Sequence, residues 1–165
     1  MRKVLAFAAA LAAVVAVFGL TSGAAQARGD MVPFSAGYRP GTIVVATRER
    51  RLYFTLGNGS AISYPVGVGR AGMAWHGQAY VAKKYRRPAW SLRPGVTPTI
   101  PGGSPRNPMG EAAIGLDRGN YAIHGTNDPA SIGGFVSHGC IRMYNADILD
   151  LFQRVPIGAK VAVVP

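Results

Sequence analysis

The segment FVSHGCIRMYN, Phe135–Asn145, gathers side chains that can support nucleophilic chemistry. It holds the only cysteine of the chain, Cys140, with His138 two residues before it and Arg142 two residues after it. A further histidine, His124, lies sixteen residues upstream of the cysteine, in YAIHGTNDP. The thiolate is the reactive form of cysteine, so a nucleophilic thiol needs a nearby base or positive charge. This segment supplies both.

The spacing within the segment predicts how the groups are arranged. If the chain is extended there, His138, Cys140 and Arg142 share one side, because alternate residues of a strand do. Gly139 leaves the backbone unobstructed, so the N–H groups of Gly139 and Cys140 can bind a substrate oxyanion. A hairpin-like return through residues 125–135 would bring His124 beside the cysteine. A nearby imidazole would then ionise the sulfur, and the sequence permits either histidine as the base.

The cluster also admits a metal site or a structural role. Two histidines and a cysteine can hold a zinc ion, with a water completing a catalytic site. Against zinc, Ser137–Cys140 lacks the usual ligand spacings, and Arg142 would place a cation beside the metal, so neither a metal nor another cofactor is expected. The cluster can also be a coincidence of core histidines and an inert thiol, since free cysteine is often buried.

The N-terminus has the layout of a secretory signal peptide. Arg2 and Lys3 form a short basic region, Val4–Leu20 is apolar, and Ala25–Ala27 is a small-residue cleavage site. The sequence therefore predicts an exported bacterial protein of the periplasm or cell envelope, cleaved near Ala27. The alternative is an uncleaved anchor, because the apolar run approaches the ~17–25 residues that span a bilayer.

Length, charge and cysteine content limit what kind of protein the mature chain can be. Removing residues 1–27 leaves 138 residues, enough for one domain with a hydrophobic core. It also lowers the net charge from +11 to +9, because two basic residues and no acidic ones are lost. In an exported protein this charge favours a membrane surface or an anionic wall polymer over nucleic acid. A lone cysteine cannot form an intramolecular disulfide, so its presence needs another reason.

The hydrophobic pattern predicts a mainly β domain. Frequent glycine and proline favour turns over long helices. Short β-branched and aromatic runs predict strands over residues 42–46, 51–56, 60–69, 77–85, 119–125 and 157–165. A helix is expected to start at Asn145 as N-cap and to stop at Pro156, and residues 88–108 are too rich in proline and glycine to be anything but a long loop. The sequence predicts a single β-sandwich-like domain with one or two short helices.

Several motifs together resemble the L,D-transpeptidase (YkuD) family. The similarity spans Thr42–Val164, with RLYF, YPVGVG, W-x-G, P-x-W and NPMG in the order that family shows. It implies a catalytic domain at 42–165, which follows the expected signal peptide at 1–27 and an N-terminal extension at 28–41. The motifs of the catalytic region are HGTN (His124–Asn127), SIG (Ser131–Gly133), SHGCIRM (Ser137–Met143) and N-x-D-x-x-x-L (Asn145–Leu151).

The resemblance implies an acyl transfer in cell-wall biogenesis. Cys140 would attack a peptidoglycan stem tetrapeptide, D-alanine would leave, and an amine would resolve the acyl-enzyme into a cross-link or an anchored protein. Water as acceptor would instead give an L,D-carboxypeptidase or a hydrolase that releases wall proteins. A peptidoglycan-binding envelope protein with an inert thiol is the non-enzymatic alternative. The resemblance further implies covalent inhibition by β-lactams of the carbapenem class.

The resemblance also implies residue roles. Cys140 is the expected nucleophile, and His124 is the expected general base, oriented by a neighbouring carbonyl. His138 is expected to support the site and is the alternative base. The other expected contributors to the oxyanion and substrate site are Gly125, Asn127, Ser137, Gly139 and Arg142.

Overall fold

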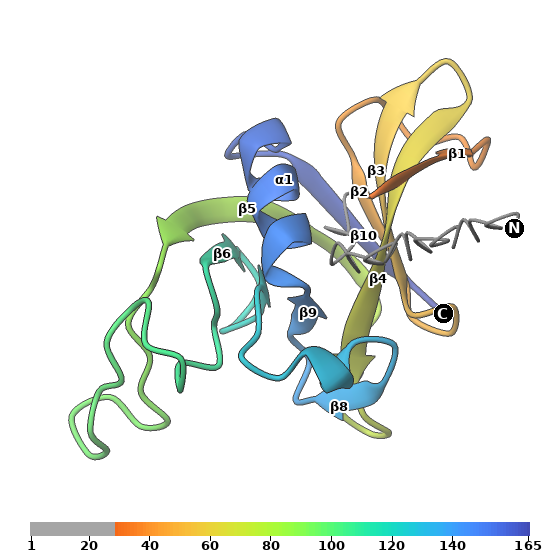
Figure 1. Ribbon diagram of the computed structural model, residues 1–165. Coiled ribbons are helices and arrows are strands. Elements are labelled where there is room, and N and C mark those ends of the chain that lie inside the picture. The colour runs from red at the N-terminus through yellow and green to blue at the C-terminus, as the bar shows by residue number, and fades with distance from the viewer. Residues whose placement is uncertain (1–28) are drawn as a thin grey trace, which may run out of the picture.

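The computed structural model describes residues 29–165, so the expected signal peptide, residues 1–27, lies outside the described residues. The described chain is mainly β, with a single α-helix, α1 (Asn145–Arg154), and a short 3-10 helix, η1 (Pro129–Ser131) (Figure 1). The mainly β fold class expected from the sequence is confirmed. The strands are β1 (Asp30–Pro33), β2 (Ile43–Ala46), β3 (Arg51–Gly57), β4 (Ser60–Gly69), β5 (Gly77–Arg86), β6 (Ala112–Leu116), β7 (Ala122–His124), β8 (Phe135–Ser137), β9 (Ile141–Met143) and β10 (Lys160–Val164).

The strands form a sheet that closes on itself. Its order is β1-β4-β3-β2-β10-β5-β6-β7-β9, and β9 pairs again with β4 through Val66 and Met143. The long strand β4 therefore belongs to both layers, pairing with β1 and β3 in one part and with β8 and β9 in the other. Strand β10 lies between β2, which it follows in parallel, and β5, which runs antiparallel to it. Figure 1 shows the two layers that result.

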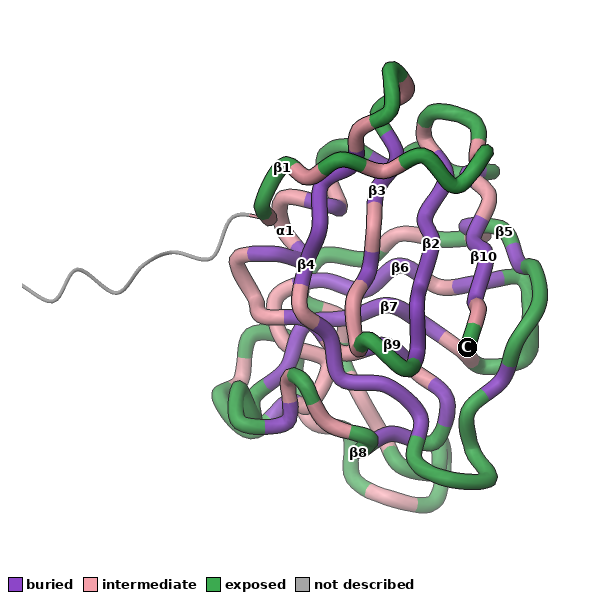
Figure 2. Tube along the Cα trace, turned by 90° about the vertical axis from the view of Figure 1, so that its right-hand side faces the viewer, coloured by how far each residue is buried: buried purple, intermediate pink, exposed green. Residues whose placement is uncertain are grey.

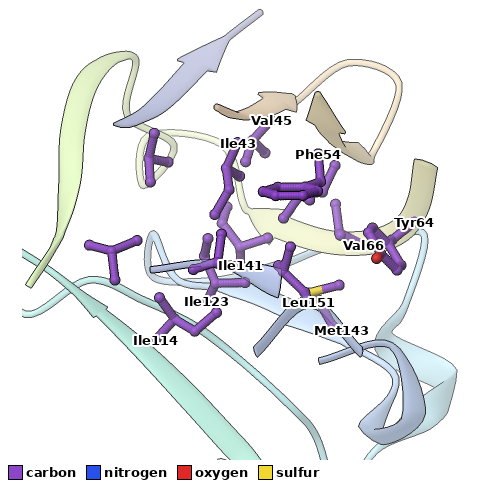
Figure 3. Packing of buried hydrophobic residues seen from close by; sticks show 14 of the residues in the cluster. Ile43, Val45, Phe54, Tyr64, Val66, Ile114, Ile123, Ile141, Met143 and Leu151 are labelled. Atoms are coloured by element: carbon purple, nitrogen blue, oxygen red, sulfur yellow. The ribbon is translucent and has the colours of Figure 1, made fainter. Parts of the chain in front are cut away.

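The core fills the space between these layers. Each strand turns alternate side chains inward, so apolar residues of both layers meet there. Burying one such aliphatic or aromatic side chain stabilises the fold by about 1.5–3 kcal/mol. Figure 3 shows members of the buried cluster facing one another: Ile43, Val45 and Phe54 from one layer, and Ile114, Ile123 and Ile141 from the other.

Helix α1 covers one side of this core and packs against β6 and β7. Its buried Ile148 and Leu151 recur at helical spacing, as the sequence predicted. The expected N-cap is wrong by one residue: Tyr144 occupies that position without a side-chain cap, and Asn145 is the first helical residue. The Asn145 side chain instead makes hydrogen bonds to a neighbouring loop.

The predicted long loop is more ordered than its composition indicated. Trp90 and Ile100 pair across it as an isolated β-bridge. The buried Asn107 side chain donates hydrogen bonds to the carbonyls of Pro88, Ile100 and Pro101, at 2.8, 3.3 and 3.1 Å. These hydrogen bonds join the two ends of the loop. Within residues 29–165, no helix combines the length and apolar character needed to cross a membrane.

Candidate active site

Two short neighbouring strands, β7 and β9, bring the candidate catalytic residues together. They run parallel, with Ile123 opposite Ile141 and His124 opposite Arg142. Since Ile123 and Ile141 face the core, the alternate residues His124, Arg142 and Cys140, which directly precedes β9, belong to the other face. The expected hairpin-like return is wrong, because a parallel pair needs a crossover connection, here built from η1 and β8.

A tight turn before Cys140 holds the cysteine in place. The Ser137 hydroxyl donates to the Cys140 carbonyl at 2.6 Å and accepts from the Gly139 N–H at 3.0 Å. The Trp75 indole N–H donates to the Gly139 carbonyl at 3.0 Å, and the indole stacks on the Tyr121 ring. Gly139 has φ +119°, and a Cβ there would lie 2.4 Å from Tyr121. Only glycine fits this position.

The turn revises two details of the expected geometry. Because the Gly139 N–H already donates to Ser137, the Cys140 N–H is the backbone donor left for a substrate oxyanion. Residues 138–139 form a bend rather than a strand, so the alternation that was expected to align His138 with Cys140 applies only from Cys140 onward. Cys140 itself is partly exposed, and its Sγ lies 4.0 Å from the Asn120 carbonyl oxygen.

His124 is a buried, uncharged imidazole with one basic nitrogen. The residue is 5% exposed, and Nδ1 lies 2.6 Å from the Gly125 carbonyl oxygen. A carbonyl oxygen only accepts, so Nδ1 carries the proton and Nε2 is the basic nitrogen. Burial is the main cause that lowers the pKa of His124, to about 4. The positive charge of Arg142 lowers this pKa further, whereas hydrogen bonding to the carbonyls of Gly125 and Pro108 raises it. The imidazole is therefore uncharged at neutral pH.

The thiol is also in its uncharged form at rest. Burial raises the pKa of Cys140, and this outweighs the Ala122 backbone N–H and the Arg142 charge, which both favour the thiolate. Together with the lowered pKa of His124, this disfavours in the unliganded protein the thiolate–imidazolium pair expected from the sequence. The arrangement suits proton transfer that accompanies attack on a substrate.

His138 has a different partner. It is exposed, and its Nε2 contacts a guanidinium nitrogen of Arg70. A guanidinium only donates, so Nε2 of His138 accepts this hydrogen bond and its lone pair is occupied. Arg70 follows β4 directly, and its backbone N–H donates to the Ser137 carbonyl at 3.0 Å. The arginine thus ties His138 to the turn that carries Cys140.

Asn145 makes contacts beside the candidate site that the sequence pattern did not reveal. Its Oδ1 accepts the backbone N–H groups of Glu111 and Thr126, at 3.2 and 3.1 Å, and its Nδ2 donates to the Thr126 carbonyl at 3.0 Å. A Cβ on Gly110 or Gly125 would lie 2.1 or 2.2 Å from Oδ1. The start of α1 is thereby tied to the loop that carries the carbonyl acceptor of His124. The sequence feature that could have drawn attention to this residue is the asparagine of the N-x-D-x-x-x-L motif.

The remaining expected site residues lie around this centre. Gly125 is buried and supplies the carbonyl that holds His124, whereas Asn127 is exposed on the following loop. Arg142 is partly exposed, and its Nε is buried without a hydrogen-bond partner among residues 29–165. The same residues contain no group of three or more His, Cys, Asp or Glu side chains placed to hold a metal ion.

This fold and this site can be compared with known proteins. Residues 40–163 match YkuD, the L,D-transpeptidase catalytic domain. The chain belongs to the YkuD family. The putative L,D-transpeptidase YqjB of Bacillus subtilis is 37% identical to this YkuD-family chain over 127 residues, which cover 73% of this chain and 69% of YqjB. The probable L,D-transpeptidase YbiS of Escherichia coli is 38% identical over 137 residues, which cover 72% of this chain and 43% of YbiS.

A solved structure shares the YkuD fold. L,D-transpeptidase 3 from Mycobacterium tuberculosis, in complex with a faropenem-derived adduct, superposes with a TM-score of 0.62. The superposition covers 75% of this chain and 60% of that one, at 17% sequence identity. At this identity the likeness shows a common fold and carries no residue roles.

Proposed function

We propose that this YkuD-family protein is an exported peptidoglycan L,D-transpeptidase with Cys140 as nucleophile and His124 as general base. The observation that carries the proposal is the β7–β9 pair, which presents both side chains on one face. The hydrogen bond from His124 Nδ1 to the Gly125 carbonyl leaves Nε2 as the basic nitrogen. Family membership supports the reaction class. The proposed substrates are the stem tetrapeptides of the cell wall.

In the acylation step, Nε2 of His124 takes the thiol proton as Sγ of Cys140 forms a bond to the stem carbonyl carbon. The Cys140 N–H donates to the oxyanion, and the Arg142 charge favours the sulfur as it becomes negative. When the carbon–nitrogen bond breaks, the imidazolium of His124 gives its proton to the departing D-alanine amine. A thioester remains on Cys140.

In the second step, an amine of another stem attacks the thioester. His124 takes the proton from the attacking nitrogen, the carbon–sulfur bond breaks, and the proton returns to the thiol of Cys140. The lowered pKa of the buried imidazole makes its protonated form a ready proton donor in each half-reaction. The full cycle thus begins and ends with uncharged His124 and Cys140.

The acceptor decides which product forms. A stem amine gives a cross-link that contributes to cell shape, and an amine on a protein gives a wall anchor. Water gives carboxypeptidase or protein-releasing activity, which is the alternative on the same scaffold. Export with cleavage near Ala27 would place the protein in the periplasm or envelope. The +9 charge of the mature chain would then favour contact with anionic wall or lipid.

The direct test incubates the purified protein with defined disaccharide-tetrapeptides and reads the products by mass spectrometry. We expect Cys140-dependent loss of D-alanine with formation of cross-linked dimers, and Cys140→Ala should abolish both. A carbapenem should add covalently to the native protein and not to Cys140→Ala, as read by intact mass. Unchanged muropeptide processing by Cys140→Ala would contradict the enzyme proposal and favour the non-enzymatic alternative.

A further inference from the structure

A cavity of about 540 Å³ lies on the outer face of the other layer, beneath an N-terminal arm, residues 33–38. Small-ligand sites typically measure about 300–1,000 Å³. In Figure 2 the segment that follows β1 crosses the ends of β4, β3 and β2. The arm is fixed at its start, because the Phe34 N–H donates to the Gly59 carbonyl at 2.7 Å. The proposed transpeptidase chemistry uses none of these residues.

The register of the sheet builds the floor of this cavity. Asp30, Ser63, Tyr53 and Val44 are directly opposite one another on β1, β4, β3 and β2. Residues opposite one another in a sheet share a face, so these four form one row across the layer. A second row, two residues along β3, contains Arg51, Ala46 and Val164. Tyr53 and Arg51 thus stand over a floor of small side chains.

Aromatic rings line the cavity between floor and arm. The Phe34 ring stacks on Tyr53 with centroids 4.8 Å apart, and the Tyr38 ring centroid lies 6.3 Å from that of Phe34. Two hydrogen bonds fix the polar groups: Tyr53 Oη donates to Glu49 at 2.5 Å, and Arg51 donates to Ser63 Oγ at 3.2 Å. The cavity is therefore formed before any ligand arrives.

Unused polar groups converge on these rings. Asp30 and Tyr38 also line the cavity, and no side-chain hydrogen bond joins either of them to another residue within 29–165. Glu49 adds an acceptor, and Arg51 keeps further N–H donors. Charges of both signs beside apolar rings fit an uncharged ligand that has many hydroxyl groups and apolar C–H faces. These are the properties of a sugar ring.

Two competing ligand classes fit less well. An anionic polymer would meet Asp30 and Glu49, two of only seven acidic residues in a chain with 18 basic ones. An extended peptide that binds by strand addition needs an unpaired sheet edge. The floor here is the face of β4, β3 and β2, strands that already have partners on both sides.

We infer that this cavity binds the glycan strand of peptidoglycan, an inference that relies on the proposed function for the identity of the polymer. Strand β4 carries Ser63 in the cavity floor and, further along, pairs with β9 beside Cys140. A glycan held on the outer face is thereby fixed relative to the site that receives the stems. Binding the polymer through its sugars raises the effective concentration of stems at Cys140.

The probe for this site is the tetrasaccharide of β-1,4-linked N-acetylglucosamine, titrated into the full chain by NMR. We expect saturable binding, with shifts centred on Tyr38, Tyr53 and Arg51. Tyr38→Ser and Arg51→Gln should each weaken binding about tenfold or more. The matched controls, Tyr85→Ser and Arg106→Gln, change exposed side chains outside the cavity and should bind like the native protein.

Activity supplies a second measurement that separates sugar binding from folding. Tyr38→Ser and Arg51→Gln should turn over a sugar-free tetrapeptide at the native rate and act about tenfold more slowly on polymeric peptidoglycan. Failure of the native chain to bind the tetrasaccharide would overturn the inference, as would equal losses in the controls or displacement of the sugar by a sugar-free tetrapeptide.

The two proposals fail in distinguishable ways. Cys140→Ala should bind the tetrasaccharide like the native chain, because Cys140 does not line the cavity. Cys140-dependent turnover without sugar binding would leave the proposed function standing and overturn the glycan site. Sugar binding without Cys140-dependent turnover would support the cavity as a sugar site and contradict the proposed transpeptidase.

Discussion

The two sides of Cys140 each present a histidine, and the structure treats them differently. On the β7 side, His124 is buried and donates from Nδ1 to a carbonyl, so its Nε2 remains basic. On the β8 side, His138 is exposed and its Nε2 accepts from the guanidinium of Arg70. His138 is the nearer residue in sequence, yet its basic nitrogen is occupied. In the proposed mechanism, the partner of each ring, and not its distance along the chain, decides which histidine can take the thiol proton.

The largest expected effect separates the two histidines directly. A positioned general base contributes about 10²–10⁴-fold to a rate. His124→Gln should therefore reduce carbapenem acylation and muropeptide turnover by about 10³-fold, whereas His138→Gln should reduce them by less than about tenfold. Stopped-flow acylation rates of the two variants measure this. A larger loss in His138→Gln, with both variants folded by near-ultraviolet circular dichroism, would reverse the assignment.

The next effect tests what holds the loop beside the buried His124 in place. Asn145→Ala removes the amide that joins α1 to the loop carrying Gly125. A displacement of about 1 Å at a catalytic group can cost about 10²-fold, and we expect a loss of this order in turnover. The matched control is Gln153→Ala on the exposed side of the same helix, which should keep the native rate. Native turnover by Asn145→Ala would show that the loop needs no such tie.

The pH dependence of acylation tests the buried His124 as the base without mutation. With a pKa of about 4, His124 stays neutral and competent at pH 5. A base with the ordinary histidine pKa of about 6.5 would be almost fully protonated there, about a thirtyfold loss of the active form. The acylation rate should therefore remain near its pH 7 value at pH 5 and fall only near pH 4. An acid limb centred at pH 6–7 would contradict His124 as the base.

The smallest expected effect is on stability and concerns Asp147, an acidic residue that is buried as His124 is. It is fully buried with no hydrogen-bond partner for either oxygen within residues 29–165, and burial raises its pKa to about 7, with Asp150 and Asp30 adding to the shift. As pH rises from 4 to 7, the unfolded chain gives up this proton before the folded one, so the free energy of unfolding decreases. Asp147→Asn should remove this decrease and stabilise the protein by about 2 kcal/mol at pH 8 and hardly at pH 4.

Urea unfolding at the two pH values measures this difference. Asp128→Asn, at an exposed aspartate, is the control and should leave stability unchanged at both. An equal effect of Asp147→Asn at pH 4 and pH 8 would mean that its carboxyl group titrates normally in the folded protein.

Local sequence patterns predicted many of the individual elements, but not β1, β6 or β8. The apolar runs at 42–46 and 51–56 form β2 and β3, paired antiparallel as expected, and the helical spacing after Asn145 forms α1. A strand pattern does not reveal its partner, however. The parallel β7–β9 pair therefore could not be distinguished from a hairpin, although both arrangements bring His124 toward Cys140.

The identity of the site residues could be predicted where a sequence motif contains them. Their hydrogen-bond partners and charge states could not, because tertiary contacts determine these. Asparagine is a favoured N-cap, which is why the sequence predicts a cap at Asn145, but a distant loop offers its side chain three backbone partners. The Gly139 N–H was expected to be free, but Ser137 accepts from it. The uncharged resting state of Cys140 and His124 follows from burial, which no local pattern records.

Strand β10 has a consequence for how the protein is made. It is the last of the described strands to be synthesised, yet it occupies the middle of the sheet between β2 and β5. Until residues 160–164 emerge, both neighbours present unpaired backbone edges, which are templates for aggregation. The two halves of the sheet therefore join late, and an interrupted nascent chain would be a target for chaperones rather than a smaller folded protein.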